Sequence, residues 1–396
     1  MTRLRLTGFS LVLLVTMAMT TLAFFALAVA SSDLQEEFGI SRLQLGLLAA
    51  VNTLVGGLFA PAAGRLSDRI GGRRTVTVTL LISGVTAVLT ALSQSYVMLL
   101  VSMALAGLPQ ALGNPGTNKA IATGIPMMHR GFITGVKQSG VQAAVFVSGA
   151  AVPFLSRNFG WRSAIWLTAG LSFAALAATP LITTRDDLEE VSTSTSGRRV
   201  KLPTFVNQVA IYALLLGAVG GGLSRFLPLF AEEEIGLSMT RAGLVFGVQG
   251  LVAIPVRLAS GTLLDRGVSA RLTLAVMGFG GAVAVLLILA STWSGEGLLW
   301  AGTVAAGVTI GSWNTAANLA MIRQRENAGR ASGRMILGFM MGLTIGGPAV
   351  GWSVDQFGYS PAWLASAALA FAGGLAIAMR PRDEASVMLP AEGVRS

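Results

Sequence analysis

Twelve apolar runs, each close to the length of a membrane-spanning helix, constrain this chain more than any other feature. An α-helix needs about 20 apolar residues to cross the hydrocarbon core of a bilayer. The runs cover residues 9–30, 43–63, 76–93, 96–118, 132–155, 161–182, 205–230, 240–260, 272–292, 297–319, 335–354 and 361–379. Charged residues make up only 12% of the chain, against about 25% in soluble proteins. The sequence therefore predicts an all-α integral membrane protein with twelve transmembrane helices.

Positive charge is distributed unevenly over the connections between these runs. With a cytoplasmic N-terminus, twenty of the 28 Lys and Arg residues fall in cytoplasmic loops and tails, and four fall in outer loops. Cytoplasmic loops are the ones that carry an excess of Lys and Arg. We therefore predict a plasma (inner) membrane protein with both termini in the cytoplasm. The first run imitates a secretory signal, but we expect it to remain as a helix because the second half contains a matching run.

The second half of the chain repeats the first at an offset of 197 to 198 residues. Gly46 is matched by Gly243, and the segment Gly64, Leu66, Asp68, Arg69 and Arg74 is matched by Gly261, Leu263, Asp265, Arg266 and Arg271. Further on, Phe159-Gly160 is matched by Phe357-Gly358. Two six-helix halves related by an axis along the membrane normal are a transporter architecture. We predict one bundle at 1–182, a second at 204–396, and a cytoplasmic linker at 183–203.

Loop 64–74 carries the most specific motif, Gly64-Arg65-Leu66-Ser67-Asp68-Arg69-Ile70-Gly71-Gly72-Arg73-Arg74. It resembles the loop between helices 2 and 3 of the major facilitator superfamily. The resemblance implies a secondary transporter whose halves alternate, with this loop latching them when the carrier faces outward. A carboxylate suits the positive end of a helix dipole. The latch residues would be Gly64, Asp68, Arg69, Arg73 and Arg74, with Gly261, Asp265 and Arg266 in the second copy; a solvated loop that only sets topology is the alternative.

The chain departs from the drug-antiporter branch of that family at two places. The segment 102–107 has no Arg before Gly107, where that branch carries one early in helix 4. The run 132–155 has no Gly-Pro pair, which is part of that branch's helix 5 signature. Both departures reduce the case for proton-coupled drug efflux.

The ionisable residues inside the runs are all positive. All 18 Asp and Glu residues map to connections, tails or the ends of runs, whereas Lys137 and Arg225 lie within runs. An ionisable group at membrane depth is costly and is functional by default, and the planar fork of Arg suits a carboxylate. We predict that Arg225 and Lys137 contact an anionic substrate. The alternatives are a snorkelling Lys137 and an Arg225 paired with Asp33 or Glu232–Glu234 as an outer gate.

A further cation and several amides extend this candidate site. Arg257 resembles a helix 8 Arg of monocarboxylate carriers, although Ala253 replaces the Asp that those carriers place four residues earlier. Pairing of Arg257 with Asp265 is its alternative. Gln110, Asn114 and Asn118 share one helix face, as do Asn314 and Asn318. We predict a cavity lined by Asn114, Asn314, Asn52, Gln249 and Gln142; interhelical hydrogen bonding is the alternative for each amide.

Together these features favour a secondary active transporter of a small organic anion or carboxylate, with a central site between the two bundles. Efflux of amphipathic drugs is the second hypothesis, although the runs lack the carboxylate that it usually needs. We do not expect an enzyme: Cys is absent, His occurs once, and no phosphate-binding Gly-rich loop is present. We expect no cofactor, no metal, no nucleic-acid partner and a monomer. The substrate identity, the direction of transport and a possible coupling ion remain open.

Overall fold

The computed structural model describes residues 3–125, 127–181, 203–266, 268–322 and 328–379. These residues form helices joined by short connections, and no strand occurs among them. The first half contains α1 (Arg3–Val29), α2 (Ser31–Phe38), α3 (Arg42–Ile70), α4 (Gly72–Ala91), α5 (Tyr96–Leu105), α6 (Gly107–Gly124), α7 (Met127–Phe159), α8 (Trp161–Ala177) and η1 (Thr179–Leu181). The second half contains α9 (Thr204–Glu233), α10 (Met239–Asp265), α11 (Ala270–Ser294), α12 (Glu296–Val308), α13 (Trp313–Ile322), α14 (Ala328–Phe357) and α15 (Tyr359–Ala378).

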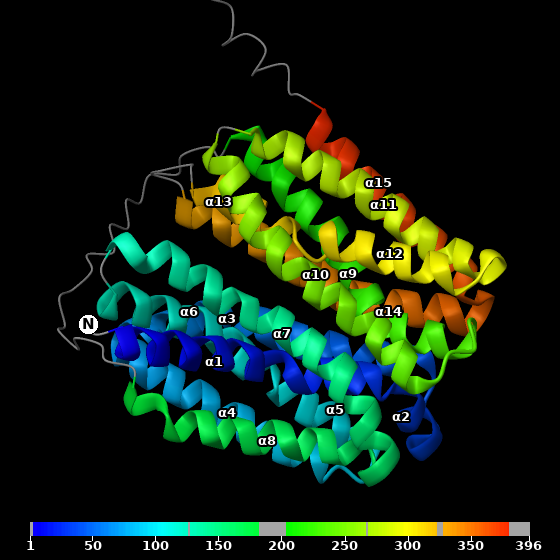
Figure 1. Cartoon of the computed structure of the whole chain (residues 1–396), viewed down its shortest axis with the longest axis horizontal. Helices are drawn as coiled ribbons and strands as arrows, with labels where there is room; N and C mark the ends of the chain where they lie inside the picture. The colour runs from blue at the N-terminus through cyan, green and yellow to red at the C-terminus, as the bar shows by residue number, and fades with distance from the viewer. Residues whose placement is uncertain (1–2, 126, 182–202, 267, 323–327, 380–396) are drawn as a thin grey trace, which may run out of the picture.

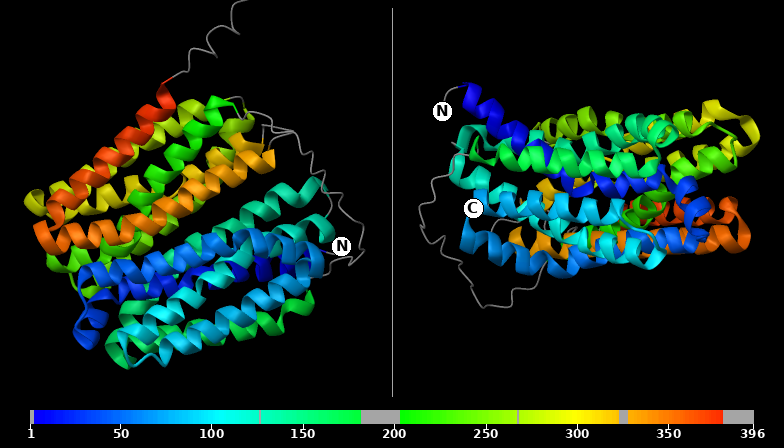
Figure 2. Two further views of the ribbon diagram at one scale, coloured as in Figure 1. Left: turned by 180° about the vertical axis from the view of Figure 1, so that it is seen from behind. Right: turned by 90° about the horizontal axis from the view of Figure 1, so that it is seen from below.

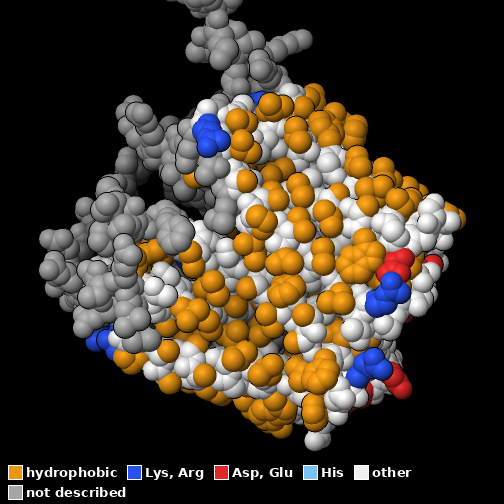
Figure 3. Space-filling view, in the orientation of Figure 1, with side chains coloured by type: hydrophobic (Ala, Val, Ile, Leu, Met, Phe, Trp, Pro, Cys, Tyr) orange, Lys and Arg blue, Asp and Glu red, His pale blue; other side chains and the backbone are white. Residues whose placement is uncertain are grey.

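Each of the twelve predicted runs is helical over most of its described length, so the predicted fold class is confirmed. Within the described part of the chain, ten helical stretches are long and apolar enough to cross a membrane. The run 161–182 forms α8, which has 17 residues, followed by η1. The run 297–319 is divided between α12 and α13, which are separated by Thr309–Ser312. Figure 3 shows apolar side chains over the middle of one face and charged side chains toward its edges, as expected for a multi-pass membrane protein.

The helices of the two halves form two bundles that lie side by side. In Figure 1, α1 to α8 occupy the lower part of the molecule and α9 to α15 the upper part, and the same division is visible from behind in Figure 2. Buried apolar side chains such as Leu27, Leu216 and Phe230 fill the interior. The predicted linker 183–203 lies outside the described residues except for Pro203.

The repeat read from the sequence reappears in the backbone. Gly160 and Gly358, which are repeat mates, have φ values of +75° and +81°. Each stands between two long helices, where a left-handed φ favours Gly because it has no Cβ. Equivalent turns therefore join α7 to α8 and α14 to α15. The N-terminus of α3 is stabilised differently, by a capping box between Ser41 and Gln44.

The bundles meet along two lines, α3 with α14 and α7 with α10. Gly46 of α3 lies against the backbone of Gly347, and Gly149 of α7 lies against the backbone of Gly243. These two contacts are equivalent under the repeat, because Gly243 is the mate of Gly46 and Gly347 the mate of Gly149. Small residues let helices approach closely in a membrane. The interface between the bundles therefore contains the same glycine–glycine contact at two equivalent positions.

Among the described residues, the contacts of α3 with α14 lie toward the N-terminal end of α3. The α3–α14 line runs from Arg42, whose backbone lies against Gly351, to Gly57, which lies near Met340. Farther along α3, a Cβ added to Gly64 would have no neighbour within 4 Å. We call the Arg42 end the closed end and the Gly64 end the open end.

Helix packing inside a bundle gives a testable expectation for Gly342 of α14. A Cβ at this position would overlap the backbone of Leu214 and Ala218 on α9. We expect Gly342→Ala to destabilise the protein by about 1–3 kcal/mol, because the helices must move apart. Thermal unfolding in detergent measures the change.

The matched control is Gly170→Ala in the middle of α8. Gly170 is exposed, and nothing lies within 4 Å of a Cβ placed there. Because Ala is the better helix former by about 0.8–1.0 kcal/mol, this variant should unfold at the same temperature as the wild type or above it. Equal effects of the two substitutions would show that close α9–α14 packing does not limit stability.

Candidate functional site at the bundle interface

Arg225 lies in α9 with its guanidinium group fully buried. Its side chain has a relative exposure of 0%, and Nε, Nη1 and Nη2 have no hydrogen-bond partner within the part of the chain that the structure describes. The phenol of Tyr96, from the other bundle, is close enough to interact with it electrostatically. Arg225 stands eight residues before Glu233, which is about 12 Å of helix from the closed end. A buried, unpaired guanidinium is expensive unless an anion binds it.

The acids that could have paired with Arg225 are engaged elsewhere or lie apart from it. Glu233 accepts from Arg42 Nη2 at 2.8 Å and from the Tyr359 hydroxyl at 2.6 Å. No ion pair joins Arg225 to Asp33 or Glu232 in the described residues. The outer-gate alternative for Arg225 is therefore not seen in this conformation.

Lys137 lies in α7, in the other bundle, and is also fully buried at 0% exposure. Its Nζ donates hydrogen bonds to Asn114 Oδ1 at 3.2 Å, Thr117 Oγ1 at 2.9 Å and Asn118 Oδ1 at 2.6 Å. All three acceptors belong to α6 and are uncharged. We call this arrangement the lysine cage. Sequence reasoning singled out Lys137, Asn114 and Asn118 separately and missed Thr117, which carries no distinguishing signal in the sequence.

The predicted amides divide into exposed and buried groups. Asn114 is exposed and Asn314 is partly exposed, whereas Asn52, Gln249 and Gln142 are buried. The Asn52 amide donates to the Met103 carbonyl oxygen at 3.0 Å, so it joins α3 to α5. Its geometry matches the interhelical alternative. Asn114 Oδ1 also accepts a hydrogen bond from Gln138 Nε2 at 3.2 Å. Asn114 therefore joins α6 to α7 and is exposed at the same time.

Arg257 of α10 binds the break between α12 and α13. Its Nε and Nη2 donate to the Gly311 carbonyl oxygen at 3.0 and 2.7 Å. Carbonyl groups near the end of a helix lack their helical partners, and the guanidinium fork supplies two donors to this one. The side chain of Asp265, the alternative partner of Arg257, lies outside the described residues.

The predicted latch loop is at the open end. The carboxylate of Asp68 accepts from Lys119 Nζ of α6 at 3.3 Å, within the same bundle. Arg69, Arg74 and Arg266 are exposed and Arg73 is partly exposed. The side-chain environments of Gly261 and Asp265 lie outside the described residues. In this conformation Asp68 is engaged inside its own half, so the latch role stays a prediction.

The closed end contains a cluster that sequence reasoning missed. Asp355 of α14 accepts from the backbone N–H groups of Arg42 and Leu43 at 3.2 and 2.9 Å, and so caps the N-terminus of α3 across the interface. Arg42 Nη1 lies 3.7 Å from Asp355 and Arg42 Nη2 2.8 Å from Glu233. We call Arg42, Glu233, Asp355 and Tyr359 the closed-end cluster. In the sequence its charges look like ordinary loop charges at span ends.

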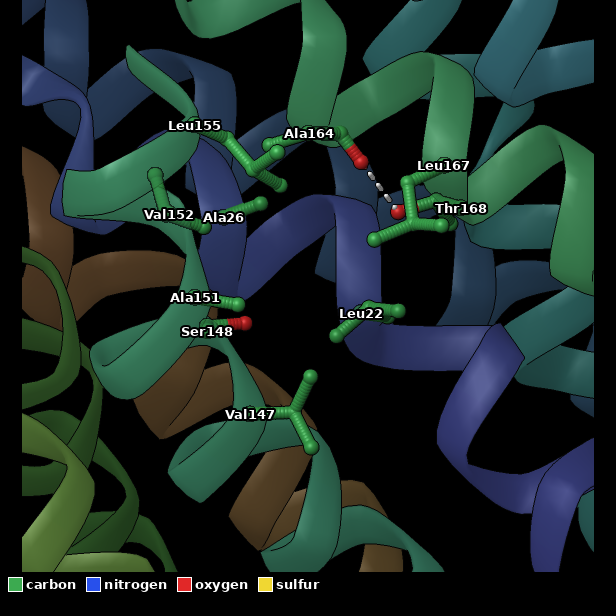
Figure 4. A pocket seen from close by; sticks show the side chains of 10 residues that line it. All are labelled: Leu22, Ala26, Val147, Ser148, Ala151, Val152, Leu155, Ala164, Leu167 and Thr168. Atoms are coloured by element: carbon green, nitrogen blue, oxygen red, sulfur yellow. Dashed lines mark hydrogen bonds between the residues drawn. The ribbon is translucent and has the colours of Figure 1, made fainter. Parts of the chain in front are cut away.

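Two hollows in the structure are unsuited to an organic anion. The first lies between α1, α7 and α8, is lined mainly by apolar side chains such as Leu22 and Val152, and has a volume of about 10 Å³, so it could hold one water molecule (Figure 4). The second, of about 320 Å³, is rimmed by Asp33, Glu36 and Glu37. Hydrogen bonds from Arg162 keep the pKa of Glu37 below its usual range, which keeps that carboxylate negative.

Comparison with known proteins identifies the family. A family model described as Major Facilitator Superfamily matches residues 11–325. The chain belongs to the major facilitator superfamily. The sequence-based assignment to this superfamily is thereby confirmed, and the family and the curated relatives that the chain matches are transporters, not enzymes.

Curated relatives of this superfamily member carry different substrate names. A hexuronate transporter of Bacillus subtilis is 25% identical over 89% of both chains. The multidrug resistance protein MdtG of Yersinia enterocolitica is 26% identical over 64% of this chain, and the human voltage-gated purine nucleotide uniporter is 24% identical over 67% of it. The alignments cover 63% and 66% of the lengths of these last two proteins, slightly under two thirds of each.

Solved structures agree on the superfamily fold. A bacterial homologue of the human lysosomal transporter Spinster, in an inward-facing and occupied conformation, superimposes with a TM-score of 0.72 at 16% identity over 94% of each chain. Its inward-facing and unoccupied form gives a TM-score of 0.71. At this identity the likeness concerns the fold alone.

Proposed function

We propose that this transporter carries a small organic anion, most simply a carboxylate, and that Arg225 is its charge partner. The observation that carries the proposal is the fully buried guanidinium without a hydrogen-bond partner in the described residues. A carboxylate can accept two parallel hydrogen bonds from such a fork. The exposed amide of Asn114 and the partly exposed amide of Asn314 come from opposite bundles and would orient the rest of the solute.

The charge balance of the membrane region supports an anion. All 18 acidic residues of the chain lie outside the apolar runs or at their ends, whereas Lys137 and Arg225 lie inside. A low-dielectric interior with positive groups attracts negative solutes. The names of two relatives, a hexuronate transporter and a purine nucleotide uniporter, also refer to anionic solutes.

The transport cycle follows from the two bundles. Residues 1–182 and 204–396 would act as units that rock about the interface, with the solute near the membrane midplane. With cytoplasmic termini, as the loop charges favour, the closed end faces outward and the open end faces the cytoplasm. A solute held by Arg225 would then be covered from outside. We propose that one chain suffices for the cycle.

Drug efflux is a second candidate, and the observation that favours it is the similarity to MdtG. Amphipathic drugs are mostly cationic or neutral, and a buried guanidinium without a neighbouring carboxylate repels cations. A substrate screen on the purified, reconstituted protein separates the two functions. The panel contains D-glucuronate, D-galacturonate, lactate, ATP and ethidium.

We expect at least one of the anions to raise the thermal stability of the protein and to exchange across the proteoliposome membrane, with ethidium doing neither. Stabilisation arises because the anion binds only the folded state. Transport of ethidium without binding or exchange of any anion would contradict the anion proposal and support efflux.

A further inference from the structure

The two lysines that contact α6 residues or belong to α6, Lys137 and Lys119, have different kinds of partner. Lys119 of the same helix pairs with the carboxylate of Asp68 at 3.3 Å, and its side chain is partly exposed. Lys137 has no carboxylate within salt-bridge distance in the described residues, and its three partners are two amides and one hydroxyl. A carboxylate favours the charged form of a lysine, because it attracts the positive charge and has no donor for the lone pair of the neutral amine.

The partners of Lys137 can serve both protonation states. An ammonium group has three N–H donors, and the cage provides three oxygen acceptors within 3.2 Å. A neutral amine has two N–H donors and one lone pair, and an amide that turns over, or a hydroxyl that rotates, donates to that lone pair. The cage therefore offers a full set of hydrogen bonds before and after loss of a proton.

In the described residues, no ion pair joins Lys137 to a charged group on the helices packed against α7. Between Leu6 and Val29, α1 has no ionisable side chain, and the ionisable residue of α8, Arg162, is bound to Glu37 at the far end of the bundle. On α6 the other cation, Lys119, is bound to Asp68. On α10, Arg257 is bound to the Gly311 carbonyl and Arg241 to Glu296, and the side chain of Asp265 lies outside the described residues.

A proton has a short path to this group. Asn114 and Asn118 bind Nζ directly, and both side chains are exposed. Lys137 itself is fully covered. The ammonium group thus lies directly beneath two exposed amide side chains.

From these observations we propose that Lys137 is a reversible proton-binding site of the transport cycle. The step is the release of one proton from the Nζ ammonium to water, which leaves a neutral amine in the cage, and its rebinding on return. The inference adds a coupling ion to the proposed function, but the site is defined without reference to the solute.

The experiment uses proteoliposomes on a solid-supported membrane and applies a pH jump in the absence of any solute. Proton binding to a buried site moves charge and gives a transient current. We expect this transient for the wild type and for Lys119→Met, the matched lysine control. We expect Lys137→Met to reduce it to the level of protein-free liposomes.

A second variant keeps the lysine and tests the chemistry of the cage. Asn118→Asp places a carboxylate at the position of the 2.6 Å acceptor, so both groups should stay charged and the transient should be lost although Lys137 is present. Wild-type transients in both Lys137→Met and Asn118→Asp would overturn the proposal. Because no solute is added, the result is independent of whether the carrier moves anions or drugs.

Discussion

Arg225→Gln is expected to abolish exchange of the organic anion while making the folded protein more stable. Each charge-assisted hydrogen bond is worth about 1.5–3 kcal/mol, so loss of two from Arg225 to a carboxylate lowers anion affinity by at least about a hundredfold. The free energy of unfolding without solute is expected to rise, because a buried charge without a partner in the described residues is replaced by a neutral amide. Exchange in proteoliposomes and thermal unfolding without solute measure the two effects.

Two further variants define what Arg225 contributes. Arg225→Lys keeps the charge but loses the planar fork, so we expect weak exchange between that of the wild type and that of Arg225→Gln. The matched control is Arg241→Gln, because Arg241 is an exposed residue paired with Glu296 at the closed end and should leave exchange unchanged. Wild-type exchange by a stably folded Arg225→Gln protein would refute the assignment of Arg225 as charge partner.

Disruption of the closed-end cluster is expected to open that end. Asp355→Asn weakens the cap on the backbone N–H groups of Arg42 and Leu43 and removes the ion pair at 3.7 Å. Because hydrogen bonds to charged groups are worth about 1.5–3 kcal/mol each, the open population should rise roughly tenfold to a hundredfold. The chain contains no Cys, so spin labels can be attached at single introduced sites.

The labels are placed by Gln94→Cys, in the loop between α4 and α5, and Ser294→Cys, at the end of α11, two exposed positions in opposite bundles. Pulsed electron paramagnetic resonance should give one short distance for the labelled wild type and an added longer distance for Asp355→Asn. Glu37→Gln is the control, because its ion pair with Arg162 lies inside one bundle. An unchanged distance distribution in Asp355→Asn would mean that the cluster does not hold the bundles together.

Most of the fold could be predicted because membrane insertion depends on the composition of each segment taken alone. The twelve apolar runs, the repeat and the motif at Asp68 required no knowledge of contacts. The break at Thr309–Ser312 was not predicted, since run 297–319 as a whole has the hydropathy of an unbroken span, and the contact between Arg257 and the Gly311 carbonyl joins residues more than fifty positions apart. Hydropathy contains no information about such pairs.

The candidate site was only partly accessible from the sequence for the same reason. Depth in a run drew attention to Arg225 and Lys137, because a charge there is costly wherever it points. The partners of Lys137 on α6 and the role of Asp355 at α3 depend on which helices are neighbours. Asp355 and Arg42 are more than three hundred residues apart, and each alone looks like an ordinary residue at the membrane surface.

The paired glycine contacts bear on the speed of transport rather than on its specificity. Backbone contacts backbone at Gly46–Gly347 and again at Gly149–Gly243. No interlocked side chain therefore has to be displaced at these points when one bundle tilts against the other. The two equivalent contacts, related by the same symmetry axis, would allow the bundles to tilt against each other without repacking of side chains. We expect a low activation barrier for reorientation, with the turnover rate governed by the polar groups at either end.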